Sequence, residues 1–498
     1  MIPSKRQETL YNIWQTTASN LLIQAVAGSG KTTTLMGIVE RCKFRTLFLA
    51  FNKSIQEEIS GKIESSGFTH AKALTLHSLG LSAIRYKFKN EMVVKTGKNY
   101  DLIKSLQSYN KRLFSKFSWE ERAKVTMTLM EMNDISRIFL EERPREIFKI
   151  MAGMDKYFYE TDNIVELWDE FLYIREESYK GKVIIDFIDM IYVPVKFNLL
   201  IPVQPYYLLI DEAQDLNLVQ HHFIEQLIDQ GDVNKWVAVG DRRQAIYGFS
   251  GSYASSFDIF KDKGNVIELP LDVCYRCPTL IVAEANKVYD VMEAHKTEAG
   301  VVDYIRDEQF IKKGSMVICR NNFPLIRLYF TLLSMGRKVY IKGDDIAGTI
   351  NKFLKPYNYK SIAQTTISLK GALREIENLT GKSQDQMFKM YRLKENVKIF
   401  NILAKNYPDK KDKVGELLTT FDTIFREVSE EDAITLCTIH KSKGLEADIV
   451  YILNEDLIPS KFAVSPTQLE QEENLRYVAR TRAKKEMYYL DIIDTEDF

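Results

Sequence analysis

Residues 21–32 read Leu-Leu-Ile-Gln-Ala-Val-Ala-Gly-Ser-Gly-Lys-Thr, an apolar run followed at once by a glycine loop that ends on Lys31 and a threonine. A helix-like segment, 33–41, comes next. Strand, glycine loop and helix in this order are the context of a phosphate-binding P-loop. The strict fingerprint wants glycine where this chain has Ala25. The stretch still predicts a nucleotide site, because other kinds of glycine-rich turn between a strand and a helix fit the sequence GSGKT poorly.

The residue types in this loop suit phosphate chemistry. Gly28 and Gly30 permit a tight turn in which backbone N–H groups converge at a helix N-terminus, where phosphate binds. Lys31 adds a positive charge, and we expect the hydroxyl of Thr32 to ligate magnesium.

Strands and helices alternate on both sides of this loop, which predicts a parallel, doubly wound α/β sheet. The further strands that we expect in it lie at 46–50, 73–75, 207–210, 236–239 and 266–269. A second alternating series has no glycine loop of its own, so it predicts a second α/β lobe that does not cradle phosphate. Its expected strands lie at 316–319, 338–341, 434–438, 449–453 and 487–490.

Two segments interrupt the alternation. Far more chain separates Lys31 from the next acidic strand end, Asp211, than the ~30 residues of one βαβ unit. The first insertion reads as helices: Ser118 begins a capping box, and the stripe Val125, Leu129, Met132, Phe148, Met151 and Met154 reads as a subdomain core, not a cofactor site. We expect lobe 1 at 1–89 and 183–270, a helical insertion at 90–182, lobe 2 at 271–346 and 429–498, and a small insertion at 347–428.

Length and composition agree with a multidomain globular protein. The chain has 498 residues, more than the ~250–300 at which single cores stop growing. Lysine plus arginine and aspartate plus glutamate both total 68, so the chain has no formal net charge and does not attract a polyanion as a whole. Any nucleic-acid site must therefore be a local groove. No segment resembles a membrane helix or signal peptide, which predicts a cytoplasmic or nucleoid-associated protein. Among five cysteines, Cys274 and Cys277 form a lone CxxC, which is weak evidence for metal.

Asp211 and Glu212 follow a buried strand directly. Ionised carboxylates at such a place are costly unless something compensates, and magnesium is the natural compensation. Asp211 would hold the metal, and Glu212 would orient and deprotonate an attacking water. The alternative is that the pair only caps the following helix, since acidic residues favour first turns.

At this point the chain resembles the UvrD/Rep-type superfamily 1 DNA helicases, with some likeness to their F-box DNA helicase branch. The blocks that carry the resemblance, in the family's order, are Gln7, AVAGSGKT at 25–32, FNKS at 51–54, TLHS at 75–78, IDEAQD at 210–215, VGDRRQAIYGFSGS at 239–252, YR at 275–276, TIHKSKGLE at 438–446 and YVARTRA at 477–483. The family's loop also commonly begins with alanine. The resemblance implies two RecA-like P-loop NTPase lobes with two mainly helical inserted subdomains, and ATP with Mg²⁺ as cofactors.

The resemblance also implies roles for single residues. Gln7 would read adenine, Tyr275 would stack on it, and Gln244 would sense the γ-phosphate. Arg276 and Arg482 would reach that phosphate as arginine fingers, so that hydrolysis requires the lobes to close. The full set of implied ATP contacts is Gln7, Ala27, Gly28, Ser29, Gly30, Lys31, Thr32, Thr33, Tyr275, Arg276, Glu446 and Arg482, with Thr32 and Asp211 at the metal.

Single-strand binding needs stacking faces and phosphate donors, because aromatic stacking contributes roughly 1–3 kcal/mol per base whatever the base. Six residues are matched to such contacts, namely Phe51, Asn52, His77, Tyr247, Phe249 and His440. Phe249 stands where the family usually has tryptophan, and Phe51 lies one position after the relatives' aromatic. Each histidine could equally be an ordinary core residue.

The sequence thus predicts an ATP-dependent DNA helicase that translocates on single-stranded DNA, with 3′–5′ polarity by resemblance, and unwinds duplex DNA. We expect it to act as a monomer, with an unidentified protein loading partner and no membrane. The alternative is a single-stranded DNA translocase that displaces proteins without unwinding. A small-molecule P-loop kinase fits less well, because it does not account for the two arginine motifs of the second lobe. A DNA-binding protein with an inactive ATPase fits less well, because the residues expected for hydrolysis are all present. RNA in place of DNA as the bound strand is not excluded by the stacking residues.

Overall fold

The protein is described here by a computed structural model. It describes residues 3–89, 92–109, 114–115, 117–153, 167–178, 183–231, 233–248, 256–342, 351, 353–357, 359–378, 384–406, 413–419 and 433–492. The chain divides into two compact units, Met1–Ala25 with Gly30–Leu271 and Val26–Ser29 with Asp272–Phe498. Within the described residues, no helix is both long and apolar enough to cross a membrane.

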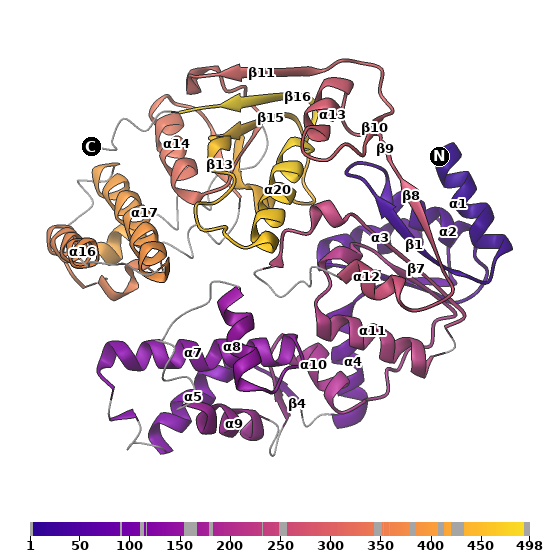
Figure 1. Ribbon diagram of the computed structural model, residues 1–498, viewed down its shortest axis with the longest axis horizontal. Coiled ribbons are helices and arrows are strands. Elements are labelled where there is room, and N and C mark those ends of the chain that lie inside the picture. Colours follow the sequence, from indigo (N-terminus) through magenta and orange to yellow (C-terminus); the bar gives the residue numbers. More distant parts are fainter. Residues whose placement is uncertain are drawn as a thin grey trace. The chain divides into compact units, whose positions relative to one another are not determined.

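The first unit is built on a six-stranded sheet in which every pair is parallel (Figure 1). The strands, in spatial order, are β3 (Ala71–Thr75), β2 (Thr46–Ala50), β6 (Tyr207–Ile210), β7 (Lys235–Gly240), β1 (Asn20–Ala25) and β8 (Val266–Leu271). All the strands expected for the first lobe are confirmed. Because they run parallel, their carboxyl ends meet at one edge, the usual place for ligands in such sheets.

Alternate residues of each strand enter two cores, one on each face of this sheet. Leu21 and Ile23 pack on one side with α1 (Lys5–Thr16), α2 (Lys31–Arg41) and α3 (Lys53–Ser65). Leu22 packs on the other with α4 (Leu76–Phe88), α10 (Asp189–Lys196), α11 (Leu218–Gln230) and α12 (Ser256–Lys261). Helices therefore cover both faces, as the doubly wound fold requires.

A helical segment of the first unit has a core of its own. It comprises α5 (Lys98–Tyr109), α7 (Trp119–Ile138), α8 (Pro144–Gly153) and α9 (Trp168–Glu177), and a two-stranded pair, β4 (Met92–Val94) with β5 (Val183–Ile185), adjoins it. Val125, Leu129, Met132 and Met151 are buried in this core and Phe148 packs against it, so the interpretation of the stripe as core is confirmed. Met154 lies outside the described residues.

The second unit contains another all-parallel six-stranded sheet. Its spatial order is β11 (Val301–Ile305), β16 (Ala483–Leu490), β15 (Ala447–Leu453), β12 (Met316–Cys319), β14 (Ile434–Thr438) and β13 (Val339–Ile341). The five strands expected from the sequence are confirmed, and β11 was missed. A short parallel pair, β9 (Val273–Cys274) with β10 (Glu293–Ala294), completes the strands.

The helices of the second unit are α13 (Thr279–Asn286), α14 (Asn322–Ser334), α16 (Ile362–Glu377), α17 (Gln384–Asn406), α19 (Ile439–Ser442) and α20 (Pro466–Arg480). Figure 1 shows α16 and α17 side by side, with α17 next to α14. Leu369 and Phe400 of α16 and α17 belong to the same core cluster as Leu325 of α14 and Val317 of β12. These helices therefore share the core of the second sheet, whereas α5–α9 form a core of their own.

Two helix glycines give a matched test of packing in the first unit. A Cβ on Gly80 of α4 would lie 1.8 Å from the Met190 carbonyl oxygen of α10, while a Cβ on Gly61 of α3 would meet nothing within 4 Å. We expect Gly80→Ala to cost roughly 1–3 kcal/mol by overpacking. Gly61→Ala should instead gain about 0.5–1 kcal/mol, because alanine loses less backbone entropy. Thermal unfolding measures both effects: the apparent Tm should fall for Gly80→Ala and not for Gly61→Ala. Equal shifts in Tm for the two variants would contradict this packing.

Candidate nucleotide-binding and hydrolysis site

The glycine loop joins the carboxyl end of β1 to the N-terminus of α2. Gly28 and Gly30 have φ of +71° and +79°, which side chains other than glycine rarely adopt. Gly30 is the N-cap residue of α2, and Lys31 begins the helix. Ser29 is 2% exposed, and its hydroxyl has no hydrogen-bond partner within the part of the chain that the structure describes. A buried hydroxyl left unpaired beside a helix N-terminus fits an anion that would occupy this loop.

Lys31 and Thr32 meet two carboxylates that follow β6. The Lys31 ammonium lies 2.9 Å from Glu212 Oε2, and the Thr32 hydroxyl donates to Asp211 Oδ2 at 3.1 Å. These contacts form because β1 and β6 end at the same sheet edge, with β7 between them. The expected pairing of the loop with the Asp211–Glu212 dipeptide is therefore present.

Three carboxylates lie close to the Lys31 ammonium group, and Arg243 adds a second cation 3.8 Å from one of them, Asp241. Burial and then Glu212 raise the pKa of Asp211 to about 7, although Lys31 lowers it. Burial likewise raises the pKa of Asp241, which follows β7. Burial lowers the pKa of Lys31, but the attraction of Glu212, Asp241 and Asp211 outweighs burial and raises it. The excess of negative charge, with the Thr32 hydroxyl beside Asp211, is a donor set that suits a hard divalent cation such as Mg²⁺.

A chain of side-chain contacts leads from Glu212 to Gln244. Gln214 donates to Glu212 Oε2 at 2.5 Å, and its carbonyl oxygen accepts the Asp241 backbone N–H at 3.0 Å. Gln244 donates to Asp241 Oδ2 at 2.8 Å. Gln244, Gln214 and Asp241 are all buried. Gln214 and Asp241 were not predicted as site residues, although both stand inside the quoted motifs.

Local backbone geometry supports this chain of contacts. Glu212 has φ +50° and ψ +44°, a left-handed conformation that costs a non-glycine residue free energy and is typical of functional sites. A Cβ on Gly240, at the end of β7, would lie 2.3 Å from the Gln214 side-chain oxygen. Glycine at 240 therefore leaves Gln214 the room to contact both Glu212 and Asp241.

Gln7 lies beside the glycine loop at the start of α1. Its amide nitrogen donates to the Thr34 hydroxyl at 3.0 Å, and its oxygen accepts the Ser4 N–H at 2.9 Å. A Cβ on Gly30 would be 3.7 Å from the same amide nitrogen. Gln7 is therefore near the expected nucleotide, although both ends of its amide are engaged within α1 and α2.

Other expected nucleotide contacts gather in the second unit. The Tyr275 N–H donates to the Gly28 carbonyl at 2.9 Å, and a Cβ on Gly28 would lie 2.6 Å from the Arg276 Cβ. The Arg276 guanidinium bonds to Glu446 at 2.7 Å and to the Thr481 carbonyl at 3.1 Å. Tyr275, Arg276 and Glu446 are thus grouped near the first residues of the glycine loop.

Tyr477 is a residue that the sequence reasoning missed. The buried Tyr477 hydroxyl accepts the Ala27 N–H at 3.1 Å, and it begins the YVARTRA block that contains Arg482. Arg482 is 1% exposed, and its guanidinium donates to the carbonyls of Val478, at 2.9 Å, and Leu445, at 3.2 Å. Thr33, by contrast, is exposed at the start of α2.

Cys274 and Cys277 flank Arg276 and are buried free thiols. Hydrogen bonding from Cys277 lowers the pKa of Cys274 to about 6. In the described part of the chain, no group of three or more His, Cys, Asp or Glu side chains could hold a metal ion, so the CxxC lacks further ligands there.

Two aromatic pairs lie after other strands of the first sheet. Phe51 follows β2, and its ring is nearly parallel to that of Tyr247, at 10° with centroids 6.3 Å apart. His77 follows β3 and stacks on Phe187, at 18° and 3.8 Å. Phe187 is 63% exposed, a signal that only the folded chain reveals, and it was not among the predicted residues. Burial lowers the pKa of His77 to about 4, so its ring is neutral near pH 7.

The remaining predicted contacts to DNA are less informative. The Asn52 side chain accepts the Ile55 N–H and caps α3, which leaves its amide group exposed. His440 lies in α19, after β14, where burial lowers its pKa to about 3. Phe249 lies outside the described residues.

A glycine loop with a half-buried lysine and a carboxylate pair, at the carboxyl edge of one of two parallel α/β sheets, defines a P-loop NTPase with two RecA-like lobes. Residues 6–265 match the UvrD/REP helicase N-terminal domain family. The chain therefore belongs to the UvrD/Rep helicase family, as its motifs predicted, and is an enzyme of that class.

Similar proteins span most of the chain. It is 23% identical to the ATP-dependent DNA helicase PcrA of Bacillus subtilis, over 95% of this chain and 81% of that protein. The ATP-dependent DNA helicase Rep of Buchnera aphidicola subsp. Acyrthosiphon pisum is 22% identical over 96% and 93%. Among solved structures, an arterivirus nonstructural protein 10 (helicase) matches 96% of this chain and 61% of its own, at 12% identity and a TM-score of 0.36.

The raised pKa of Asp211 predicts a pH-dependent stability. Its pKa lies above the ordinary 3.8 in the folded protein, at about 7, so its contribution is present below pH ~4 and is lost as pH rises through 7. Asn at position 211 does not titrate, so the Asp211→Asn variant should become more stable relative to wild type as pH rises from ~4 to ~7. The apparent Tm of both proteins, measured without Mg²⁺ from pH ~4 to ~8, checks this. The exposed Asp229→Asn serves as control, and a Tm difference independent of pH would contradict the buried charge.

Proposed function

We propose that this protein is an ATP-driven motor that moves along single-stranded DNA in the 3′–5′ direction and separates duplex DNA. The observation that carries the proposal is the buried cluster of Lys31 with Asp211 and Glu212, joined through Gln214 and Asp241 toward Gln244. The names and coverage of the PcrA and Rep relatives support DNA as the substrate.

ATP and Mg²⁺ would be held by the chemistry of the loop. Backbone N–H groups of Gly28, Gly30 and Lys31 and the unpaired Ser29 hydroxyl would bind phosphate oxygens. Thr32 and Asp211 would ligate Mg²⁺, which when bound neutralises charge on the transferred phosphoryl group. Gln7 would bind the base if its amide leaves Thr34 or Ser4.

Glu212 is placed to be the general base. Lys31 pairs with it at 2.9 Å, and phosphate oxygens would compete for the same ammonium group. If Lys31 exchanged this carboxylate for phosphate, Glu212 Oε2 would be able to orient water and accept its proton. Gln214, which also donates to that oxygen, keeps the carboxylate in place during the exchange.

The contacts from Glu212 to Gln244 offer a physical route from hydrolysis to the DNA track. Gln244 stands three residues before Tyr247, whose ring lies parallel to Phe51. A shift of Gln244 toward or away from the γ-phosphate would therefore move an aromatic side chain that can stack on bases. Phe187 on His77 offers a second stacking face in the same unit.

Arg276 and Arg482 would complete the site as arginine fingers when the lobes close. Each must change partners to do so. Arg276 would leave Glu446, and Arg482 would leave the carbonyls of Val478 and Leu445. Nucleotide-driven closure would supply these new contacts to phosphate.

Lys31→Ala should lower the rate of ATP hydrolysis roughly a hundredfold or more, because the loop loses its buried cation. A coupled ATPase assay with and without single-stranded DNA measures the effect. Lys62→Ala is the matched control, since Lys62 is half-exposed and pairs only with Glu58 in the contacts described for it. DNA-stimulated turnover by Lys31→Ala at the wild-type rate would disprove the phosphate assignment.

Tyr247→Ala should weaken single-strand binding by roughly 1–3 kcal/mol, since a stacking face is removed. Fluorescence anisotropy with a labelled oligonucleotide measures the affinity. Tyr86→Ala, which removes a tyrosine 61% exposed on α4, should leave it unchanged. Equal affinities for all three proteins would remove Tyr247 from the track.

Forked duplexes with a 3′ or a 5′ tail test direction and unwinding together. Strand release from the 3′-tailed substrate alone supports the proposal, while release from the 5′-tailed one alone reverses the polarity. ATP hydrolysis without strand release, together with displacement of a protein block, favours the translocase that does not unwind. RNA of the same sequence shows which polymer stimulates hydrolysis.

A further inference from the structure

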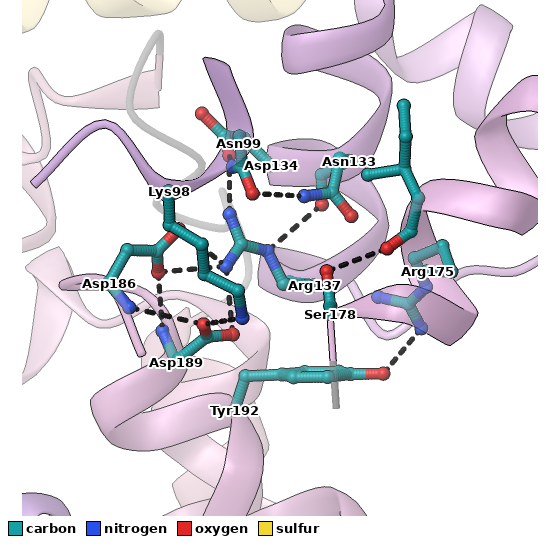
Figure 2. A network of polar contacts seen from close by, with 11 residues as sticks. Lys98, Asn99, Asn133, Asp134, Arg137, Arg175, Ser178, Asp186, Asp189 and Tyr192 are labelled. Atoms are coloured by element: carbon teal, nitrogen blue, oxygen red, sulfur yellow. Dashed lines mark hydrogen bonds and ion pairs between the residues drawn. The ribbon is translucent and has the colours of Figure 1, made fainter. Parts of the chain in front are cut away.

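A buried ionic network joins the helical segment of the first unit to the turn before α10. Lys98 begins α5, Arg137 lies near the end of α7, and Asp186 and Asp189 bracket the turn between β5 and α10. Figure 2 shows these side chains converging on one another from separate elements. The catalytic cluster described above does not include them.

Arg137 is the centre of the network. One of its terminal nitrogens lies 2.8 Å from both carboxylate oxygens of Asp186 and 2.8 Å from Asp189 Oδ1, and the other lies 2.6 Å from Asp134. The Lys98 ammonium lies 2.6 Å from the second oxygen of Asp189. Exposure is 1% for Arg137, 3% for Lys98 and 0% for Asp189.

The same two carboxylates define the backbone of the turn. The Asp186 N–H donates to Asp189 Oδ2 at 3.1 Å, and the Asp189 N–H donates to Asp186 Oδ1 at 2.9 Å. Phe187 lies between them and is 63% exposed, with its ring stacked on His77. The contacts that orient Phe187 toward solvent are therefore made by its neighbours in the turn, which Arg137 and Lys98 hold.

Energetics argue that such a network does more than stabilise the fold. Buried ion pairs lose much of their attraction to desolvation, and apolar replacements are often as stable. In some proteins buried ionic groups specify one conformation of the chain. The geometry fixed here is that of a turn which presents a large aromatic side chain to solvent.

We propose that Arg137 and Lys98 are positioning residues for single-strand binding, which hold the Asp186–Asp189 turn so that Phe187 and His77 form a base-stacking platform. This inference rests on the proposed function. It makes the helices α5 and α7, which carry the two cations, part of the device that grips DNA, although neither cation touches the strand.

A double-mutant cycle tests whether Arg137 acts through Phe187. Arg137→Lys keeps the charge, but one ammonium group cannot bridge three carboxylates. We expect it to raise the DNA concentration that half-saturates ATPase by about tenfold, the size of one lost stacking contact, with turnover at saturating DNA within twofold. Phe187→Ala should give a similar rise. In the Phe187→Ala background, Arg137→Lys should add less than twofold.

The control is Arg143→Lys on the same helical segment, whose pair with Glu141 is exposed and should not affect DNA binding. Independent effects that multiply in the double variant, or unchanged DNA affinity in a folded Arg137→Lys protein, would overturn the inference. Asp186→Asn replaces Arg137→Lys if the latter shows no cooperative unfolding.

Hydrogen exchange on the unmodified protein gives a second measurement that needs no variant. The amides of Asp186 and Asp189 should be protected before DNA is added, and exchange at unprotected rates would overturn the inference. A wild-type protein that neither binds single-stranded DNA nor responds to it in ATPase assays would contradict the proposed function. DNA binding that is sensitive to Phe187→Ala but not to Arg137→Lys would reject only the positioning role.

Discussion

The ammonium group of Lys31 lies among the carboxylates of Asp211, Glu212 and Asp241, of which the first and last are buried. Its bond to Glu212 connects the phosphate loop to the end of β6. In water such a pair would contribute little, but burial strengthens the interaction and makes an unpaired charge costly. A phosphate that binds the Lys31 ammonium group must therefore leave the Glu212 carboxylate with another hydrogen-bond partner or with a role in proton transfer. This constraint explains why Gln214 and Asp241 lie close by.

The parallel sheet places these groups within reach of one another. The glycine loop, Asp211 and Asp241 each follow a strand that ends at the same edge, and Phe51 and His77 follow two more strands of that sheet. Nucleotide chemistry and the candidate stacking faces thus share one rigid support. Under the proposed function, a small movement at the γ-phosphate would pass along the contacts from Glu212 to Gln244, which stands three residues before Tyr247.

The sequence predicted the fold class and most strands, because largely buried parallel strands such as β6 and β7 consist mainly of apolar residues. It placed the beginning of β16 at Met487 instead of Ala483, since the intervening residues are charged and pair with neighbours such as Lys312 and Asp448. It missed β11 for a similar reason: its burial is only partial.

Site residues with a chemical signature were also predicted from the sequence, whereas residues that act through geometry were not. Lys31 and Asp211 stand in motifs whose chemistry is explicit. Gln214 and Tyr477 stand inside quoted motifs and Phe187 does not, but the residue type of none of the three indicates its role, which comes from one contact or one exposed ring in the folded chain.

The most direct test of this account is the ATP affinity and single-turnover hydrolysis rate of Glu212→Gln. Removal of the carboxylate frees Lys31 for phosphate and eliminates the base, so ATP should bind at least as tightly as to wild type while hydrolysis falls roughly a hundredfold or more. Hydrolysis at the wild-type rate, or a loss of ATP binding in a folded protein, would contradict the central role of the Lys31–Glu212 pair.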